Sequence, residues 1–207
     1  MAAAGGPTAE RRGDHLRRRR VEPRGRHRGP RPQLRTPRAR GADPPAGDAV
    51  GGGLEIAAQV RDGELPAPRH VFVPAGTGGI AAGLLVGLGM AGIDATIHAV
   101  RVADRLWANR PLTLLHARRT VGLLRRHGAD VDLPRPDRLV FDHGWIGADY
   151  GVPTIAGERA ARLAAAHGLT VEPTYTAKAL AAALAALRSA DVSGPVLWVN
   201  TVNSRPL

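Results

Sequence analysis

The sequence predicts an α/β protein whose parallel, doubly wound sheet follows a disordered N-terminal segment rich in Arg, Pro and Gly. Short β-branched and apolar runs alternate with longer helical patterns after residue 50, the order that is typical of parallel sheets. The stretch 71–92 shows this order as a buried strand, a glycine-rich turn and a helix. Composition also changes abruptly at residues 48–53. We therefore divide the chain into a basic segment, 1–48, and a folded region, 49–207.

Each element in the first half of the folded region has a local signal. Apolar residues in LEIAAQV recur at helical spacing, whereas RHVFVP and ATIHAVRV are β-branched runs typical of strands. A glycine-rich turn leads into a helix of small residues, in which Gly83 and Gly87 permit close packing on a neighbour. These signals predict helices at 54–60 and 80–90 and strands at 69–74 and 95–102.

The second half of the folded region is interpreted in the same way. Gly128 follows a long helical pattern and occupies the position where glycine commonly ends helices. Thr154 stands where an N-cap is expected, and Gly168 ends the helix that follows. The resulting sheet has four or five strands. These signals predict helices at 111–127, 154–167 and 178–188 and strands at 139–141 and 196–200.

The N-terminal segment does not resemble a folded one. Residues 1–48 carry 13 arginines and 5 acidic residues, so most of the net charge of +11 lies there. Few large aliphatic residues are present to offset the loss of chain entropy on folding. The composition suggests out-of-frame translation of GC-rich DNA. An arm that binds nucleic acid is the alternative, but no aromatic residue is available to stack on bases.

Several protein classes are excluded by composition. The chain has no cysteine, so disulfides and thiolate metal sites are excluded. It has no apolar run long enough to span a membrane and no signal-peptide pattern, so we expect a cytoplasmic protein. Its histidines form no metal-binding pair, and no G-x-S-x-G motif supports a hydrolase.

The turn GTGGI, at 76–80, predicts a site for an anion. A helix N-terminus leaves backbone N–H groups without partners and carries partial positive charge. Glycines let a phosphate approach those groups, and Thr77 adds a hydroxyl donor. The spacing matches neither the Walker loop nor the dinucleotide fingerprint. Taken alone, the motif is equally compatible with a tight turn that binds nothing.

Five stretches, read in order, resemble one enzyme family: LEIAAQ, VPAGTGGIAAGLLVGL, ADYGVPT, GLTVEPTYTAKAL and VLWVNT. The family is that of the fold-type-II pyridoxal-phosphate enzymes related to D-cysteine desulfhydrase and 1-aminocyclopropane-1-carboxylate deaminase, within the tryptophan synthase β superfamily. The resemblance covers residues 50–205 and corresponds to the second, cofactor-anchoring half of that fold. It implies pyridoxal 5'-phosphate as cofactor, a small amino acid as substrate and a homodimer in the intact family.

The resemblance also implies roles for particular residues. Tyr175 corresponds to a catalytic tyrosine beside the substrate. Thr176 lies where the family places the partner of the pyridine nitrogen, and a hydroxyl there fits the desulfhydrase branch better than the deaminase branch. The residues implied to hold the cofactor phosphate are Gly76, Thr77, Gly78 and Gly79.

One departure from the family pattern bears directly on activity. The family's Schiff-base lysine lies in its first half, and Lys178, the one lysine of this chain, matches a different, structural lysine. We therefore expect a lyase- or deaminase-like chain without its reactive amine; the alternative is a catalytically inactive fragment that keeps only the phosphate-binding loop. Further departures from the pattern are Ile80, Ala177, Asn200, Val202 and Asn203.

Overall fold

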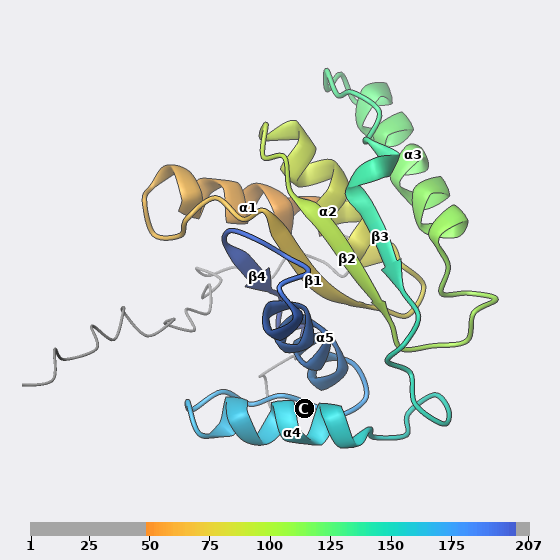
Figure 1. The fold of residues 1–207 in the computed structure, drawn as a ribbon. Helices are drawn as coiled ribbons and strands as arrows, with labels where there is room; N and C mark the ends of the chain where they lie inside the picture. Colours follow the sequence, from red (N-terminus) through yellow and green to blue (C-terminus); the bar gives the residue numbers. More distant parts are fainter. Residues whose placement is uncertain (1–48, 202–207) are drawn as a thin grey trace, which may run out of the picture. The chain divides into compact units, whose positions relative to one another are not determined.

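Four parallel strands form the sheet in the computed structural model, which describes residues 49–201 (Figure 1). The strand order is β3-β2-β1-β4, so each connection crosses over a face of the sheet. The strands pair in register from His70 opposite Thr96 to Ala75 opposite Arg101 in the central pair. Their bounds are β1 (His70–Ala75), β2 (Thr96–Arg101), β3 (Leu139–Asp142) and β4 (Val196–Trp198).

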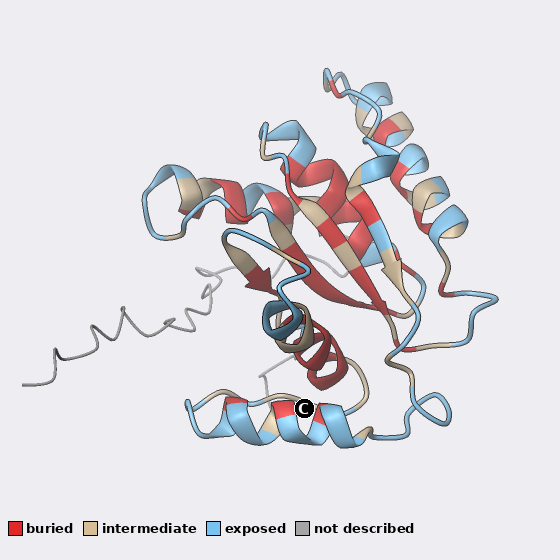
Figure 2. Cartoon of the chain, in the orientation of Figure 1, coloured by how far each residue is buried: buried red, intermediate tan, exposed pale blue. Residues whose placement is uncertain are grey.

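Helices cover both faces of this sheet, because alternate residues of each strand point to opposite sides. Val71 and Val73 of β1 join a core with residues of the first three helices, whereas Phe72 joins a second core with the last two. Buried residues are concentrated on the central strands and on α2 and α5 (Figure 2). The helices are α1 (Ala49–Arg61), α2 (Gly79–Met90), α3 (Arg110–Arg126), α4 (Ile155–Ala165) and α5 (Thr176–Ser189), with a short 3-10 turn at Pro136–Arg138.

Close packing of α1 on α2 depends on the glycines of α2. A Cβ atom on Gly83 would lie 2.3 Å from the Cβ of Ala49, and one on Gly87 would lie 2.4 Å from the carbonyl oxygen of Val50. Either substitution would push the two helices apart. The close approach predicted from Gly83 and Gly87 is therefore confirmed, and it explains why α1 begins within a glycine-rich stretch of low helix propensity.

The predicted fold class is confirmed, and every predicted helix and strand is present with ends that differ by a few residues. The largest difference is at α1, which begins at Ala49 instead of residue 54. None of the helices within residues 49–201 is long and apolar enough to cross a membrane. The disorder predicted for residues 1–48 and the departures at Val202 and Asn203 lie outside the described residues.

Candidate functional site

The glycine loop joins the carboxyl end of β1 to the first turn of α2. Gly78 precedes the helix with a φ of 81°, a left-handed conformation that glycine adopts readily. The N–H of Ala82 donates to the carbonyl of Gly78, so the N–H groups at 79–81 precede the first intrahelical bond. Thr77 and Gly79 are exposed, which leaves this end of α2 open to an anion.

The glycine loop packs closely against α3. A Cβ on Gly78 would lie only 2.0 Å from the hydroxyl oxygen of Thr113, which is fully buried and donates to the carbonyl of Asn109. Asn109 is itself the N-cap of α3, because its side-chain oxygen accepts the N–H of Leu112 at 2.9 Å. Sequence reasoning missed Thr113, although Asn109 two residues before a proline was a readable helix start.

Tyr175 lies beside the glycine loop, nearly a hundred residues away in the chain. A Cβ on Gly76 would lie 3.8 Å from Cε1 of Tyr175. The Tyr175 hydroxyl forms a hydrogen bond with the hydroxyl of Tyr150, and the two rings meet edge to face with centroids 6.1 Å apart. That hydrogen bond, helped by burial, raises the pKa of Tyr175 to about 12. The Tyr175 hydroxyl is therefore protonated at neutral pH.

Tyr150 was not singled out from the sequence, although it lies within the stretch ADYGVPT. It belongs to the loop between β3 and α4, and the residue is 54% exposed. The two tyrosine hydroxyls thus form one polar pair that borders the glycine loop on one side and solvent on the other.

Thr176 occupies a different environment from its neighbour in sequence. It is fully buried in the first turn of α5, and its hydroxyl oxygen accepts the N–H of Glu172 at 3.2 Å. The hydroxyl donates to the carbonyl or the carboxylate of Glu172, each at 3.2 Å. The structure therefore places Gly76 and Tyr175 together, whereas the Thr176 hydroxyl faces Glu172.

Glu172 closes the N-terminus of α5. Its carboxylate accepts the N–H groups of Thr174, Tyr175 and Thr176 at 2.6–2.7 Å. A carboxylate at this position satisfies donors that the helix leaves free and opposes the positive end of its dipole. Sequence reasoning missed this role because the acceptor lies four residues before the helix.

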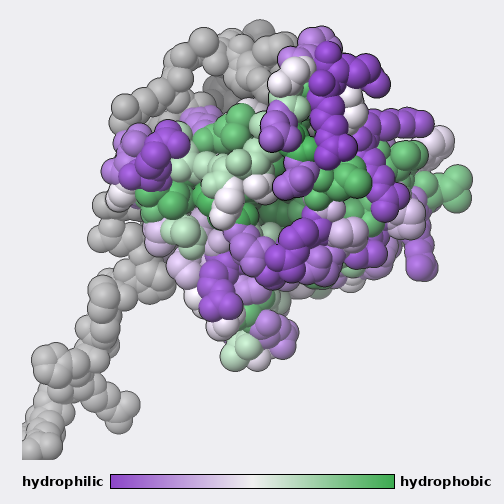
Figure 3. Space-filling view, turned by 90° about the horizontal axis from the view of Figure 1, so that it is seen from above, coloured by the Kyte–Doolittle hydropathy of each residue, from purple (hydrophilic) through white to green (hydrophobic). Residues whose placement is uncertain are grey.

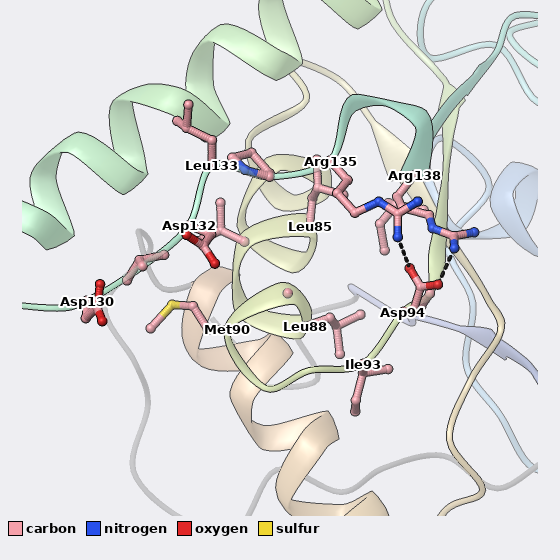
Figure 4. Close-up of a pocket in the computed structure, with 16 residues that line it drawn as sticks. Leu85, Leu88, Met90, Ile93, Asp94, Asp130, Asp132, Leu133, Arg135 and Arg138 are labelled. Carbon is pink, nitrogen blue, oxygen red and sulfur yellow. Dashed lines mark hydrogen bonds and ion pairs between the residues drawn. The ribbon is translucent and has the colours of Figure 1, made fainter.

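A separate cavity of about 310 Å³ lies at the opposite edge of the sheet, near the start of β2 (Figure 4). Its floor includes Leu85 and Leu88 of α2, and its rim carries Asp94 held by Arg135 and Arg138. From above, the surface of the described region combines apolar areas with hydrophilic borders (Figure 3). No predicted site residue lines this cavity, so it is distinct from the glycine loop.

The fold and the glycine loop agree with comparisons to known proteins. Residues 38–201 match the family described as pyridoxal-phosphate dependent enzyme. The chain belongs to this family, whose cofactor is pyridoxal phosphate. The resemblance inferred from the five sequence stretches is thereby confirmed.

Individual relatives refine this placement. The chain is 38% identical over 167 residues to nocardicin C-9' epimerase of Nocardia uniformis subsp. tsuyamanensis. The aligned region covers 80% of this chain and 49% of that protein. It is 28% identical over 151 residues to D-cysteine desulfhydrase of Salmonella paratyphi C (strain RKS4594), covering 72% and 43%. A solved structure of an ACC deaminase homologue shares the fold, with a TM-score of 0.58 and 21% identity over 73% of this chain and 45% of that one. The chain spans about half the length of these relatives.

Proposed function

We propose that residues 49–201 form the phosphate-anchoring part of a pyridoxal-phosphate-dependent lyase or deaminase of the D-cysteine desulfhydrase type. The observation that carries this proposal is the position of Gly76, Thr77, Gly78 and Gly79 at the open N-terminus of α2, directly beside Tyr175. The first turn of α2 contains no acidic residue to compete with a phosphate for the free N–H groups. The residues present therefore fit the phosphate of this cofactor.

In this proposal, Tyr175 acts on the substrate as a proton donor. When bound, pyridoxal phosphate withdraws electrons from the α-carbon of an amino acid, and the protein supplies orientation and proton transfer. The Tyr175 hydroxyl, which is hydrogen-bonded to that of Tyr150, is protonated at neutral pH like any ordinary tyrosine, so its Oη can donate to a leaving group or to a substrate atom that gains negative charge. Tyr150, which is more exposed, would exchange that proton with solvent.

The role proposed for Thr176 is to meet the pyridine nitrogen with a neutral hydroxyl. That hydroxyl now donates to Glu172, so it would have to turn its proton away from Glu172 to serve the cofactor. The Glu172 carboxylate would keep its three backbone donors when the hydroxyl turns. A neutral partner at this position favours a desulfhydrase-like chemistry over a deaminase-like one.

We further propose that the Schiff-base lysine is not contributed by this chain. Lys178 is its only lysine, and the side chain is fully buried with Nζ donating to the carbonyl of Ile146 at 2.7 Å. The anchor described here would then act with a lysine that lies outside the given sequence, or it would bind the cofactor without turnover. Both outcomes leave the phosphate site unchanged.

The second candidate reaction is epimerisation of a small amino acid. Its support is the identity of 38% to the epimerase, against 28% to the desulfhydrase. The two reactions differ in the fate of the carbon skeleton, because an epimerase returns the α-proton whereas a lyase expels a substituent. Incubation in deuterated water distinguishes them: deuterium at an inverted α-carbon indicates epimerisation, and release of a 2-oxo acid indicates elimination.

Two glycines of α2 provide a matched test of the phosphate site. Gly79 lies in the first turn with only the hydroxyl of Thr77 near its missing Cβ, at 3.9 Å, and Gly89 lies in the last turn with nothing within 4 Å. Valine at either position should therefore have the same small effect on folding. We expect Gly79→Val to weaken the binding of pyridoxal phosphate at least tenfold in equilibrium dialysis, while Gly89→Val leaves it unchanged.

Inorganic phosphate provides a second arm of the same experiment. It should compete with pyridoxal phosphate in the wild-type chain, because both would use the N–H groups of α2. The proposal is wrong if the wild-type chain binds no pyridoxal phosphate, or if the Gly79→Val and Gly89→Val variants bind it equally well.

A further inference from the structure

Lys178 is a buried basic residue in an alanine-rich helix. It lies in α5, where its neighbours Ala177, Ala179 and Leu180 are also buried. Burial lowers the pKa of its ammonium group, and the charge of Glu172 only partly opposes this. Buried ammonium groups are costly, and apolar side chains of similar size usually serve packing at least as well. The presence of lysine here therefore points to a purpose other than stability.

The partner of Lys178 identifies that purpose. Nζ donates to the carbonyl of Ile146 at 2.7 Å, in the loop 143–154 that connects β3 to α4. The methylene stem also lies close to α4, since a Cβ on Gly157 would be 3.7 Å from Cγ of Lys178. This loop carries Tyr150, four residues beyond the accepting carbonyl. Lys178 thus links the core of α5 to the segment that carries the second tyrosine.

Tyr175, the N-cap residue of α5, and Lys178, in its first turn, contact the same loop. They are three residues apart, the spacing that places two side chains on one face of a helix. Tyr175 meets the loop at Tyr150 through their hydroxyls, and Lys178 meets it at Ile146. The start of the loop is held separately, because Trp145 Nε1 donates to the carboxylate of Asp142 at 2.6 Å. Lys178 is therefore the polar attachment between α5 and the part of the loop that precedes Tyr150.

We propose that Lys178 is a positioning residue: through the carbonyl of Ile146 it holds loop 143–154 on α5 and thereby keeps the Tyr150 hydroxyl against Tyr175. This inference rests on the proposed function for its catalytic meaning, but the geometry it describes needs no cofactor. In this proposal, Lys178 supports the pair of tyrosines Tyr150 and Tyr175 by supplying a hydrogen bond, and it does not act as a nucleophile.

The tyrosine content of the chain makes this proposal testable. Tyr150 and Tyr175 are its only tyrosines, so ultraviolet absorbance of tyrosinate reports on this pair alone. In the wild type, one tyrosine should ionise late, because the hydrogen bond with Tyr150 raises the pKa of Tyr175 to about 12. In Lys178→Met, loss of the hydrogen bond to Tyr150 should lower the pKa of Tyr175 from about 12 toward its ordinary value of 10.0, an increase of up to about a hundredfold in the ionisation constant, since burial and the charge of Glu172 also raise this pKa.

The measurement is a stopped-flow pH jump, which records ionisation before the chain can unfold in alkali. Tyr150→Phe gives the reference for a Tyr175 that has lost its hydrogen bond. Arg188→Met is the matched control, since it removes an exposed cation from the last turn of the same helix and should leave the late ionisation intact. Circular dichroism at neutral pH establishes that each variant is folded.

A purely structural lysine gives a different result. It would change the unfolding midpoint of Lys178→Met and leave the late ionisation of Tyr175 in place, and that result overturns the proposal. If Lys178→Met does not fold, Lys178→Gln decides in the same way, because its shorter neutral amide does not reach the Ile146 carbonyl at the observed geometry. Failure of cofactor binding would instead contradict the proposed function while leaving the titration result valid.

Discussion

Replacing Gly78 with alanine tests how tightly the glycine loop is held against α3. Gly78 has a φ of 81°, and forcing an L-residue into this left-handed conformation costs roughly 1–2 kcal/mol. The added Cβ would also lie 2.0 Å from the hydroxyl oxygen and 3.0 Å from the Cβ of Thr113. Overpacking of this kind costs about 1–3 kcal/mol in addition. We therefore expect Gly78→Ala to lower the free energy of unfolding by roughly 2–5 kcal/mol.

Gly92 provides the matched control for this substitution. It has a φ of 72° but nothing within 4 Å of its missing Cβ, so Gly92→Ala should incur only the backbone cost. Urea unfolding followed by tryptophan fluorescence measures both, and a slope of about 1–3 kcal/mol per molar for small proteins makes the difference visible as a shift in midpoint. In a Thr113→Ala background, Gly78→Ala should lose the 2.0 Å clash with the hydroxyl oxygen and cost less than in the wild type, although the Cβ at position 113 remains 3.0 Å away.

Two results would refute this reasoning. If Gly78→Ala costs no more than Gly92→Ala, the loop does not rest on Thr113 as described. If Thr113→Ala leaves the cost of Gly78→Ala unchanged, the extra destabilisation has another source. In either case the glycine loop that we propose binds the phosphate would not be held in place by α3.

Three further predictions concern stability. Burial, together with the nearby His70, lowers the pKa of His98 from 6.5 to about 4. Between these pH values the unfolded chain binds a proton at His98 that the folded chain does not, so stability should fall as the pH falls from 6.5 to about 4. Melting temperatures measured against pH should show this fall, and it should be smaller in His98→Asn. Thr154→Ala should cost about 1 kcal/mol in urea unfolding because its hydroxyl caps α4, whereas Thr154→Ser should cost little; equal losses would contradict the cap. Asp94→Asn should cost less than about 1 kcal/mol, because Asp94 and Arg135 are exposed and Arg138 is only half-buried, and most of that loss should vanish in high salt.

The elements of this fold were predictable because their signals are local. The strand at β1 and the small-residue helix α2 are visible in the order of apolar and glycine residues alone. The start of α1 was not predictable from the sequence, because glycines disfavour a helix. The residues from Ala49 become helical only when they pack on Gly83 and Gly87. Tertiary contact overrides propensity at that point.

The candidate site was predictable to a smaller extent. The glycine loop and Tyr175 could be found from the sequence, and their proximity was implied by the family resemblance alone. Thr113 and Tyr150 could not be assigned to the site, because each reaches it through a contact between segments distant in sequence. The orientation of Thr176 was equally hidden, since it depends on where the carboxylate of Glu172 lies.

Two helices begin near Tyr175, and the chain treats their N-termini differently. Glu172 supplies a carboxylate to the N–H groups of α5, whereas the first turn of α2 has no acidic residue and follows an exposed glycine loop. A helix N-terminus carries about half a positive charge. Glu172 neutralises this charge at α5, whereas the charge at the N-terminus of α2 remains available to an anion. The same carboxylate explains the hydroxyl at Thr176. An acidic side chain there would face Glu172 at hydrogen-bonding distance, and like charges so close disfavour ionisation of both groups.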